Sequence, residues 1–323
     1  MKRALVVGLG NISHRHRRNI KRLYPDAAVM ALSASGRQVL DVPDADIIGQ
    51  TFEQALDWQP DYAIIASPAS SHLDYAIALI QAGTACLIEK PLCANRDQLA
   101  RLNQFPADAR VAVGYCLRHL PAAQLVKEQL DQQALGKIIG CQISAGQYLP
   151  LWRPTEHGDS VSSQAHLGGG VLLELSHELD YLQWFFGPCE IQSALLRHSS
   201  LLTLDVEEVA DLSLLSQGNV ACQVHLDFLQ NPAQRYCSIL GTQGRLHWDL
   251  ITNQIRHWNG TETERVLYHQ PEYDRNDMYL KQLKEFEAMT QGRPHQCVSL
   301  QEAAATIHLV DSIKQKALWG APV

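Results

Sequence analysis

Several features that would assign the chain to a specialised class are missing from its sequence. The eight cysteines are scattered and include no C-x-x-C pair, so neither a disulfide framework nor a structural zinc site is indicated. No apolar run is long enough to span a bilayer. There is no surplus of basic residues either, because the formal net charge is -7. We therefore expect no metal site, no membrane partner and no nucleic-acid partner.

The start of the chain does not resemble a secretory signal peptide. An apolar, strand-like run at Ala4–Val7 is interrupted at once by Gly8 and Gly10. Together with cysteines that fit reduced thiols, this predicts a cytoplasmic protein. The length of 323 residues, of which 46% are hydrophobic and 19% charged, is typical of a globular chain with two domains.

A glycine-rich loop follows the first predicted strand. Gly8 and Gly10 fit the pattern G-x-G-x-x-G, with Ser13 in place of the last glycine. The first glycine permits a tight turn, and the second lets the backbone approach a pyrophosphate. The amides of Asn11 and Ile12, at the start of the helix that follows, would face this anion. Since the motif lies between a strand and a helix, as it must, we predict a dinucleotide site.

The end of the second predicted strand, Ala28–Leu32, bears on the choice of cofactor. An NAD site would place a carboxylate near this position to hold the ribose 2′-hydroxyl. This chain has Ser33, Ser35 and Arg37 there, and no acidic residue before Asp41. Hydroxyls with an arginine suit a 2′-phosphate, which favours NADP over NAD. If Arg37 points into water, it does not affect the choice.

The run Glu89-Lys90-Pro91 closes another apolar segment, Ala85–Ile88. In an open α/β sheet, the chemistry takes place at the carboxyl ends of the parallel strands. We therefore expect Lys90 to lie beside the bound dinucleotide, with an ordinary surface turn as the alternative. Further strands at 62–66 and 111–115 alternate with helices, which predicts a doubly wound parallel sheet.

The pattern changes after Tyr115. Short segments now alternate polar and apolar residues and are joined by tight turns; they lie at 141–147, 191–197, 208–215, 220–228 and 236–240. This pattern predicts a mostly antiparallel sheet with one open face. The predicted fold is α/β, with a Rossmann-type parallel sheet in a dinucleotide-binding domain over residues 1–117. A second α/β domain over residues 118–323, with a mainly helical tail, would bind the substrate.

A third group of candidate residues follows three consecutive glycines at 168–170. The next segment reads as an amphipathic helix that carries His177 and Asp180 one turn apart, with Glu174 one turn before His177. Histidine can move a proton near neutral pH, and a nearby carboxylate can orient its ring. A structural histidine with ordinary polar partners is the alternative.

Together these blocks resemble the Gfo/Idh/MocA oxidoreductase family, over most of the chain. The resemblance rests on Gly8-x-Gly10, Ser67-Pro68 with His72, Glu89-Lys90-Pro91, Gly114-Tyr115 with Arg118, and Gly168-Gly169-Gly170 with His177 and Asp180. It implies NAD(P)-dependent oxidation or reduction of a CH–OH carbon in a sugar, sugar derivative or cyclitol. It also implies a homodimer or homotetramer, formed through the open sheet, and a C-terminal helix that packs back on the first domain.

The resemblance further implies roles for individual residues. Lys90 would bind the reacting hydroxyl, and His177 would be the acid/base. The candidates for cofactor binding are Gly8, Gly10, Asn11, Ile12, Ser33, Ser35, Arg37, Ser67, Pro68, His72, Glu89 and Lys90. The candidates for substrate binding are Arg118, Trp152, Arg153, Glu174 and Asp180, although Trp152 fits core packing equally well. The chain departs from the family pattern at Leu173, where an aspartate is usual, and at Cys116, where many relatives carry asparagine.

Two other functions stay open at this point. An NAD-dependent glycosidase that works through transient oxidation would show much the same sequence blocks. A regulatory protein that senses the dinucleotide would be expected to lack the lysine and histidine pair, which this chain retains. The sequence does not name the substrate or the direction of the reaction.

Overall fold

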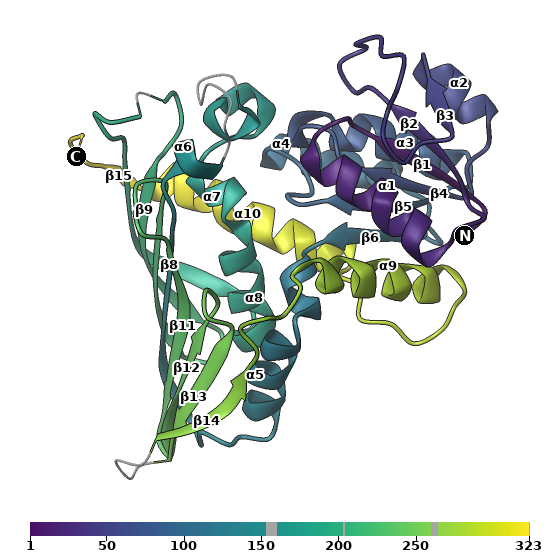
Figure 1. Ribbon diagram of the computed structural model, residues 1–323. Coiled ribbons are helices and arrows are strands. Elements are labelled where there is room, and N and C mark those ends of the chain that lie inside the picture. The colour runs from purple at the N-terminus through teal and green to yellow at the C-terminus, as the bar shows by residue number, and fades with distance from the viewer. Residues whose placement is uncertain (153–159, 203, 260–263, 323) are drawn as a thin grey trace. The chain divides into compact units, whose positions relative to one another are not determined.

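The computed structural model describes residues 1–152, 160–202, 204–259 and 264–322 (Figure 1). Its contacts divide the chain into two compact units. The first comprises Met1–Cys116 with Arg275–Ile307, and the second comprises Leu117–Asp274 with His308–Val323. The division predicted from the sequence, after residue 117, placed residues 275–307 in the second domain, while expecting the C-terminal helix to pack back on the first.

A six-stranded parallel sheet forms the centre of the first unit, in the order β3-β2-β1-β4-β5-β6. Its strands are β1 Arg3–Val7, β2 Ala28–Leu32, β3 Ile47–Gly49, β4 Tyr62–Ile65, β5 Ala85–Glu89 and β6 Val111–Gly114. All residues of β5 are buried, as expected for a parallel strand covered on both faces. This sheet confirms the predicted Rossmann-type fold; the short edge strand β3 was not predicted.

The helices of the first unit alternate with its strands. They are α1 Asn11–Leu23, α2 Phe52–Asp57, α3 His72–Gln81, α4 Arg96–Leu99 and α9 Asn276–Thr290. The helix expected near residues 95–103 is the short α4, followed by a 3₁₀ segment at Ala100–Gln104. Leu283 and Phe286 of α9 are fully buried in the same core cluster as Val6 and Ile20. The hydrophobic face of α9 thus makes it part of the first unit.

A nine-stranded sheet forms the second unit, in the order β14-β13-β12-β11-β7-β10-β9-β8-β15. Its pairs are antiparallel except for β10 with β7 and β15 with β8. The strands are β7 Ile138–Gly146, β8 Cys189–Arg197, β9 Val209–Ser216, β10 Ala221–Asp227, β11 Gln234–Gly241, β12 Gly244–Asp249, β13 Gln254–Trp258, β14 Glu264–His269 and β15 Leu318–Trp319. The mostly antiparallel sheet was predicted; β12 to β15 were not.

The helices of the second unit include one difference from the sequence prediction. They are α5 Pro121–Asp131, α6 Leu149–Trp152, α7 Val171–Glu174 and α8 Ser176–Phe186, while α10 Leu300–Lys316 begins in the first unit and ends in the second. The single helix expected after the three glycines is broken at Leu175, whose φ is -97° and ψ is 28°. Glu174 and His177 therefore lie on separate helices, and the prediction that they are one helical turn apart was wrong.

The two faces of the second sheet differ in chemistry. Helix α8 lies against one face (Figure 1). There, Tyr181 packs on Trp248 of β12 with a centroid distance of 5.5 Å. The opposite face of β9 and β10 carries polar side chains in alternate positions, among them Asp211 and His225. This alternation is the pattern of an antiparallel sheet with only one covered face.

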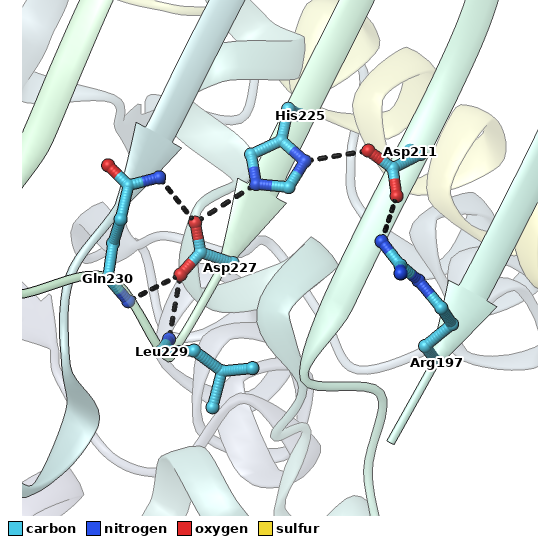
Figure 2. A network of polar contacts seen from close by, with 6 residues as sticks. All are labelled: Arg197, Asp211, His225, Asp227, Leu229 and Gln230. Atoms are coloured by element: carbon cyan, nitrogen blue, oxygen red, sulfur yellow. Dashed lines mark hydrogen bonds and ion pairs between the residues drawn. The ribbon is translucent and has the colours of Figure 1, made fainter. Parts of the chain in front are cut away.

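A network of polar contacts crosses this second face (Figure 2). His225 lies between two carboxylates, with Nδ1 2.6 Å from Asp211 Oδ1 and Nε2 3.1 Å from Asp227 Oδ2. Arg197 donates to the other oxygen of Asp211 at 2.5 Å. The hydrogen bonds to Asp227 and Asp211 raise the pKa of His225 to about 9, although burial acts in the opposite direction. The imidazole is therefore protonated at neutral pH.

Candidate active site

The loop after β1 has the geometry that a dinucleotide loop requires. Gly8 has a φ of +113°, and a Cβ at this position would lie 2.4 Å from the carbonyl oxygen of Ala66. Only glycine fits there, because both the backbone angle and the space exclude a side chain. Ser13 takes the place of the third glycine of the motif; it is buried, and its hydroxyl donates to the same carbonyl at 3.3 Å.

The start of α1 fits the pyrophosphate of a dinucleotide. Gly10 is the N-cap and supplies no capping side chain, and the first turn contains no acidic residue. A Cβ added at Gly10 would meet no heavy atom within 4 Å, so a ligand can approach the backbone closely. The amides of Asn11 and Ile12 begin the helix, where the helix dipole favours an anion. These residues would hold the diphosphate of NAD or NADP.

The loop after β2 presents the residues expected to choose between the two cofactors. The hydroxyls of Ser33 and Ser35 lie 3.3 Å apart, and the amide of Arg37 donates to Ser33 Oγ at 3.0 Å. Ser35 and Arg37 are exposed, and so is Asp41 further along. Because Val7 pairs with Leu32 in the sheet register, this turn lies at the same sheet edge as the glycine loop.

His72 connects the loops that follow β4 and β5. It is 1% exposed, with Nε2 2.8 Å from the carbonyl of Ser67 and Nδ1 2.9 Å from that of Pro91. Burial lowers the pKa of His72, although both carbonyls act in the opposite direction. The structure thus uses the ring to join the Ser67-Pro68 loop to the segment that carries Lys90. Direct contact of His72 or Pro68 with the cofactor stays a prediction.

Lys90 directly follows β5, at the carboxyl edge of the sheet. Its amide donates to Glu89 Oε2 at 3.2 Å, and Glu89 is 7% exposed. A Cβ at Gly114, opposite Glu89 in the register, would lie 3.1 Å from the carboxyl group. Glu89 is therefore packed beneath Lys90, which is only half-buried. Direct contact of Glu89 with the cofactor stays a prediction.

In the second unit, two predicted substrate residues bind each other. Arg118 donates to Asp180 through Nε at 2.9 Å and Nη2 at 2.8 Å, and the two residues are 6% and 1% exposed. The Arg118 guanidinium also lies 5.4 Å from the centre of the Trp184 ring. His177, half-buried, is on the same helix as Asp180. The bidentate pair fixes Asp180, and substrate contact by either partner stays a prediction.

The remaining substrate candidates are placed less fully. Glu174, at the end of α7, accepts a hydrogen bond from Ser162 Oγ. Trp152 is the last residue of α6, and Arg153 lies outside the described residues. The roles proposed for these three residues are still predictions.

The structure buries two basic residues of α1. His16 and Arg17 belong to the run His14–Arg18, which has the appearance of a solvated helix face, yet they are 0% and 2% exposed. Arg17 donates to the carbonyl of Pro43 at 2.9 Å, and burial lowers its pKa. The spacing of His16 and Arg17 relative to the buried Ile20 is the one signal that could have indicated their burial.

The described part of the chain lacks two further features. There, no group of three or more histidine, cysteine or acidic residues is arranged to hold a metal ion. Within the same residues, no helix combines the length and apolar character needed to cross a membrane.

Comparison with known proteins agrees with this geometry. Residues 2–115 match the family model of the Gfo/Idh/MocA oxidoreductases described as an NAD-binding Rossmann fold, and residues 123–247 match the model of the C-terminal domain of the same family. The chain belongs to the Gfo/Idh/MocA oxidoreductase family. It is thus a member of an NAD-binding oxidoreductase family, and its similarity to that family, inferred above from scattered motifs, extends through both domains.

Individual relatives are distant. Oxidoreductase P35 of Formosa agariphila is 26% identical over 76% of this chain and 76% of its own length. The inositol 2-dehydrogenase of Paracoccus denitrificans is also 26% identical, over 55% of this chain and 52% of its own length. The chain thus spans about half the length of this second relative. A levoglucosan dehydrogenase solved in complex with NADH and L-sorbose has the same fold, with a TM-score of 0.86, 17% identity and coverage of 98% of this chain and 97% of that one.

Proposed function

We propose that this member of the family transfers a hydride between the nicotinamide of NAD(P) and a CH–OH carbon of a sugar, sugar derivative or cyclitol. One observation carries the proposal. Strands β1, β4 and β5 are neighbours, and the register pairs Val7 with Ile65 and Ile65 with Ile88. Lys90 therefore follows a strand that ends at the same edge as the glycine loop, beside the topological switch point where nucleotides bind.

The proposed chemistry divides between cofactor and protein. The nicotinamide, when bound, supplies or accepts the hydride. Lys90 donates a hydrogen bond to the reacting oxygen and stabilises the negative charge that develops on it. His177 takes up the hydroxyl proton in the oxidation direction and returns it in reduction. The names of an inositol dehydrogenase and a levoglucosan dehydrogenase among the relatives support a cyclitol or sugar as substrate.

We further propose that the chain prefers NADP to NAD. The support is the exposed turn after β2, which offers two hydroxyls and a guanidinium where an NAD site would have a carboxylate. A 2′-phosphate would satisfy these groups, whereas a 2′-hydroxyl would leave the guanidinium without an anion. Fluorescence titrations with NADPH and NADH test this preference: tighter binding of NADH would contradict it.

The state of assembly and the location in the cell are also proposals. We propose a homodimer or homotetramer formed through the polar face of the second sheet, since two copies could pair the alternating acids and bases of that face. A monomer by light scattering would contradict this. A cytoplasmic location is supported by the eight cysteines, all of which are free thiols in the structure.

The proposed activity is tested with a panel of sugars, inositols and nucleotide sugars. The change in absorbance of the reduced nicotinamide should accompany conversion of at least one of them. Release of a free sugar from a glycoside, with no net change in reduced cofactor, would instead identify a glycosidase. Tight binding of a dinucleotide without turnover on any member of the panel would favour a regulatory protein.

A further inference from the structure

His16 on α1 occupies a buried position beneath the strand end that carries Lys90. It is 0% exposed, and its Nε2 lies 2.7 Å from Glu89 Oε1. The other oxygen of the same carboxylate accepts the amide of Lys90 at 3.2 Å. One carboxylate oxygen of Glu89 thus contacts the His16 side chain of α1, and the other accepts a hydrogen bond from the backbone amide of Lys90. All three residues belong to the first unit.

The surroundings of His16 leave this arrangement little freedom. The ring of Tyr279 meets the imidazole edge-on, with a centroid distance of 6.1 Å, and the Arg15 guanidinium covers Tyr279 at 4.6 Å. Burial raises the pKa of Tyr279, so its hydroxyl stays neutral. On the far side, the backbone of Gly114 approaches the Glu89 carboxyl group. A buried hydrogen bond in a packed environment holds its partners in one geometry.

The two ends of this contact serve different parts of the proposed reaction. Helix α1 begins at Asn11, next to Gly10, where the diphosphate of the cofactor would bind, and β5 ends at Glu89, directly before Lys90. A hydrogen bond from the middle of α1 to Glu89 therefore couples the element that holds the cofactor to the element that holds the lysine. His72 fastens the other side of the lysine, through the carbonyl of Pro91.

We propose that His16 is a positioning residue: through Glu89 it fixes Lys90 relative to the cofactor-binding end of α1. This inference rests on the function proposed above and adds a residue to its site. A displacement of about 1 Å at a reacting group can lower the rate about 100-fold. Loss of the His16 contact should therefore act on turnover more than on substrate or cofactor binding.

The test compares two replacements of His16. In His16→Gln the side-chain amide nitrogen can take the place of Nε2, whereas in His16→Asn it is too short to reach Glu89. We expect His16→Asn to lower kcat about 10- to 100-fold with KM and the dinucleotide Kd within about threefold of wild type, and His16→Gln to restore most of the loss. His308→Asn, at an exposed site on α10, is the matched control and should behave as wild type.

Two further measurements separate positioning from general damage. If His16 acts through Lys90, His16→Asn should change the residual rate of Lys90→Met by less than about twofold, because the two effects are not additive. Acetylation of Lys90 relative to the exposed Lys284, followed by mass spectrometry without cofactor, should differ at least threefold between His16→Asn and wild type. This second readout does not depend on activity.

The outcomes distinguish the inference from the proposed function. Full additivity with Lys90→Met, equal kcat in His16→Asn and wild type, or unchanged labelling of Lys90 would overturn the positioning role. So would a loss in His16→Gln as large as in His16→Asn. Failure of the wild-type protein to bind either dinucleotide would instead defeat the proposed function, while the labelling of Lys90 would still decide whether His16 positions the lysine.

Discussion

Single residues account for most of the difference between a Rossmann-type fold and a working site. Gly8 and Gly10 are two positions apart, yet the structure demands different things of them. At Gly8 both the backbone angle and the carbonyl of Ala66 exclude a side chain, while the space beside Gly10 is open. Gly8 is therefore required by the fold of the loop, whereas Gly10 would be required by the close approach of the ligand.

This difference predicts opposite results for two alanine variants. Gly8→Ala should lower the melting temperature and weaken dinucleotide binding, because the added Cβ is strained at positive φ and collides with Ala66. Gly10→Ala should leave the free energy of unfolding within about 0.5 kcal/mol of wild type, but raise the dinucleotide Kd because the methyl group blocks the approach of the pyrophosphate. Calorimetry gives both quantities. Wild-type affinity in Gly10→Ala would exclude this loop as the binding site.

At this scale the sequence predicts residue types better than their partners. Lys90 follows a buried strand, and this position singled it out only together with the glycine loop at the start of the chain. The buried contact of His16 with Glu89 could not, because the two residues are far apart in the chain and His16 lies in a run of basic residues that suggests solvent. The pairing of Arg118 with Asp180 was also not predicted, because these residues too are far apart in the chain. Both were expected to contact a substrate.

Among the elements, α9 shows how a distant segment completes a domain. The helix follows the second sheet in the chain, yet its Leu283 and Phe286 are fully buried in the core of the first unit. Tyr24 on α1 donates to Glu287 of the same helix at 2.8 Å. Truncation of the chain before α9 would therefore expose the face of the parallel sheet that α9 covers.

A core substitution tests the contribution of α9. Phe286→Ala should destabilise the first unit by about 3–5 kcal/mol, since it empties the space of a fully buried aromatic ring. Urea unfolding should show a transition at lower denaturant. Lys284→Ala, on the exposed side of the same helix, should leave the midpoint unchanged. A midpoint in Phe286→Ala equal to wild type would remove α9 from the core.

Element boundaries were predictable where the hydrophobic pattern was continuous. Strand β2 coincides with its predicted range, whereas β12 to β14 were missed although Leu246, Trp248 and Ile255 alternate with polar residues and are buried. Arg245, His247 and other charged or polar neighbours conceal that alternation in the sequence. The break at Leu175 was also not foreseen, because nothing in the apolar run before it indicates where a helix stops.

For the molecule as a whole, the network around His225 predicts how stability depends on pH. The pKa of His225 is raised from 6.5 to about 9, so its stabilising contribution is fully present below pH 6.5 and is lost as the pH rises through about 9. Burial alone would raise the pKa of Asp227, but hydrogen bonds from His225 and from the amides of Leu229 and Gln230 outweigh it and lower that pKa.

The variant His225→Gln should lack this dependence. The difference in free energy of unfolding between wild type and variant should shrink by about 1 kcal/mol between pH 6.5 and pH 9, a figure reduced for screening because the imidazole is partly exposed. Unfolding curves at a series of pH values provide the measurement. A difference that stays constant over this range would mean that His225 does not hold its proton in the folded protein.

The two-domain plan was accessible from sequence because each sheet leaves a distinct pattern: continuous apolar strands between helices in the first half, and alternating strands with tight turns in the second. The return of residues 275–307 to the first unit is not visible in these patterns, and only the family resemblance implied that a C-terminal helix packs back on the first domain. Sequence order alone does not reveal such a return. Of the two residues proposed for the chemistry, Lys90 belongs to the first unit and His177 to the second.

The most direct test of the whole account is one variant measured in two ways. Lys90→Ala and the control Lys284→Ala are each titrated with NADPH and NADH and then assayed on the best substrate of the panel. We expect Lys90→Ala to bind the dinucleotide nearly as wild type does but to turn over roughly 10²- to 10⁴-fold more slowly, with Lys284→Ala unchanged. Wild-type turnover in Lys90→Ala would contradict the account.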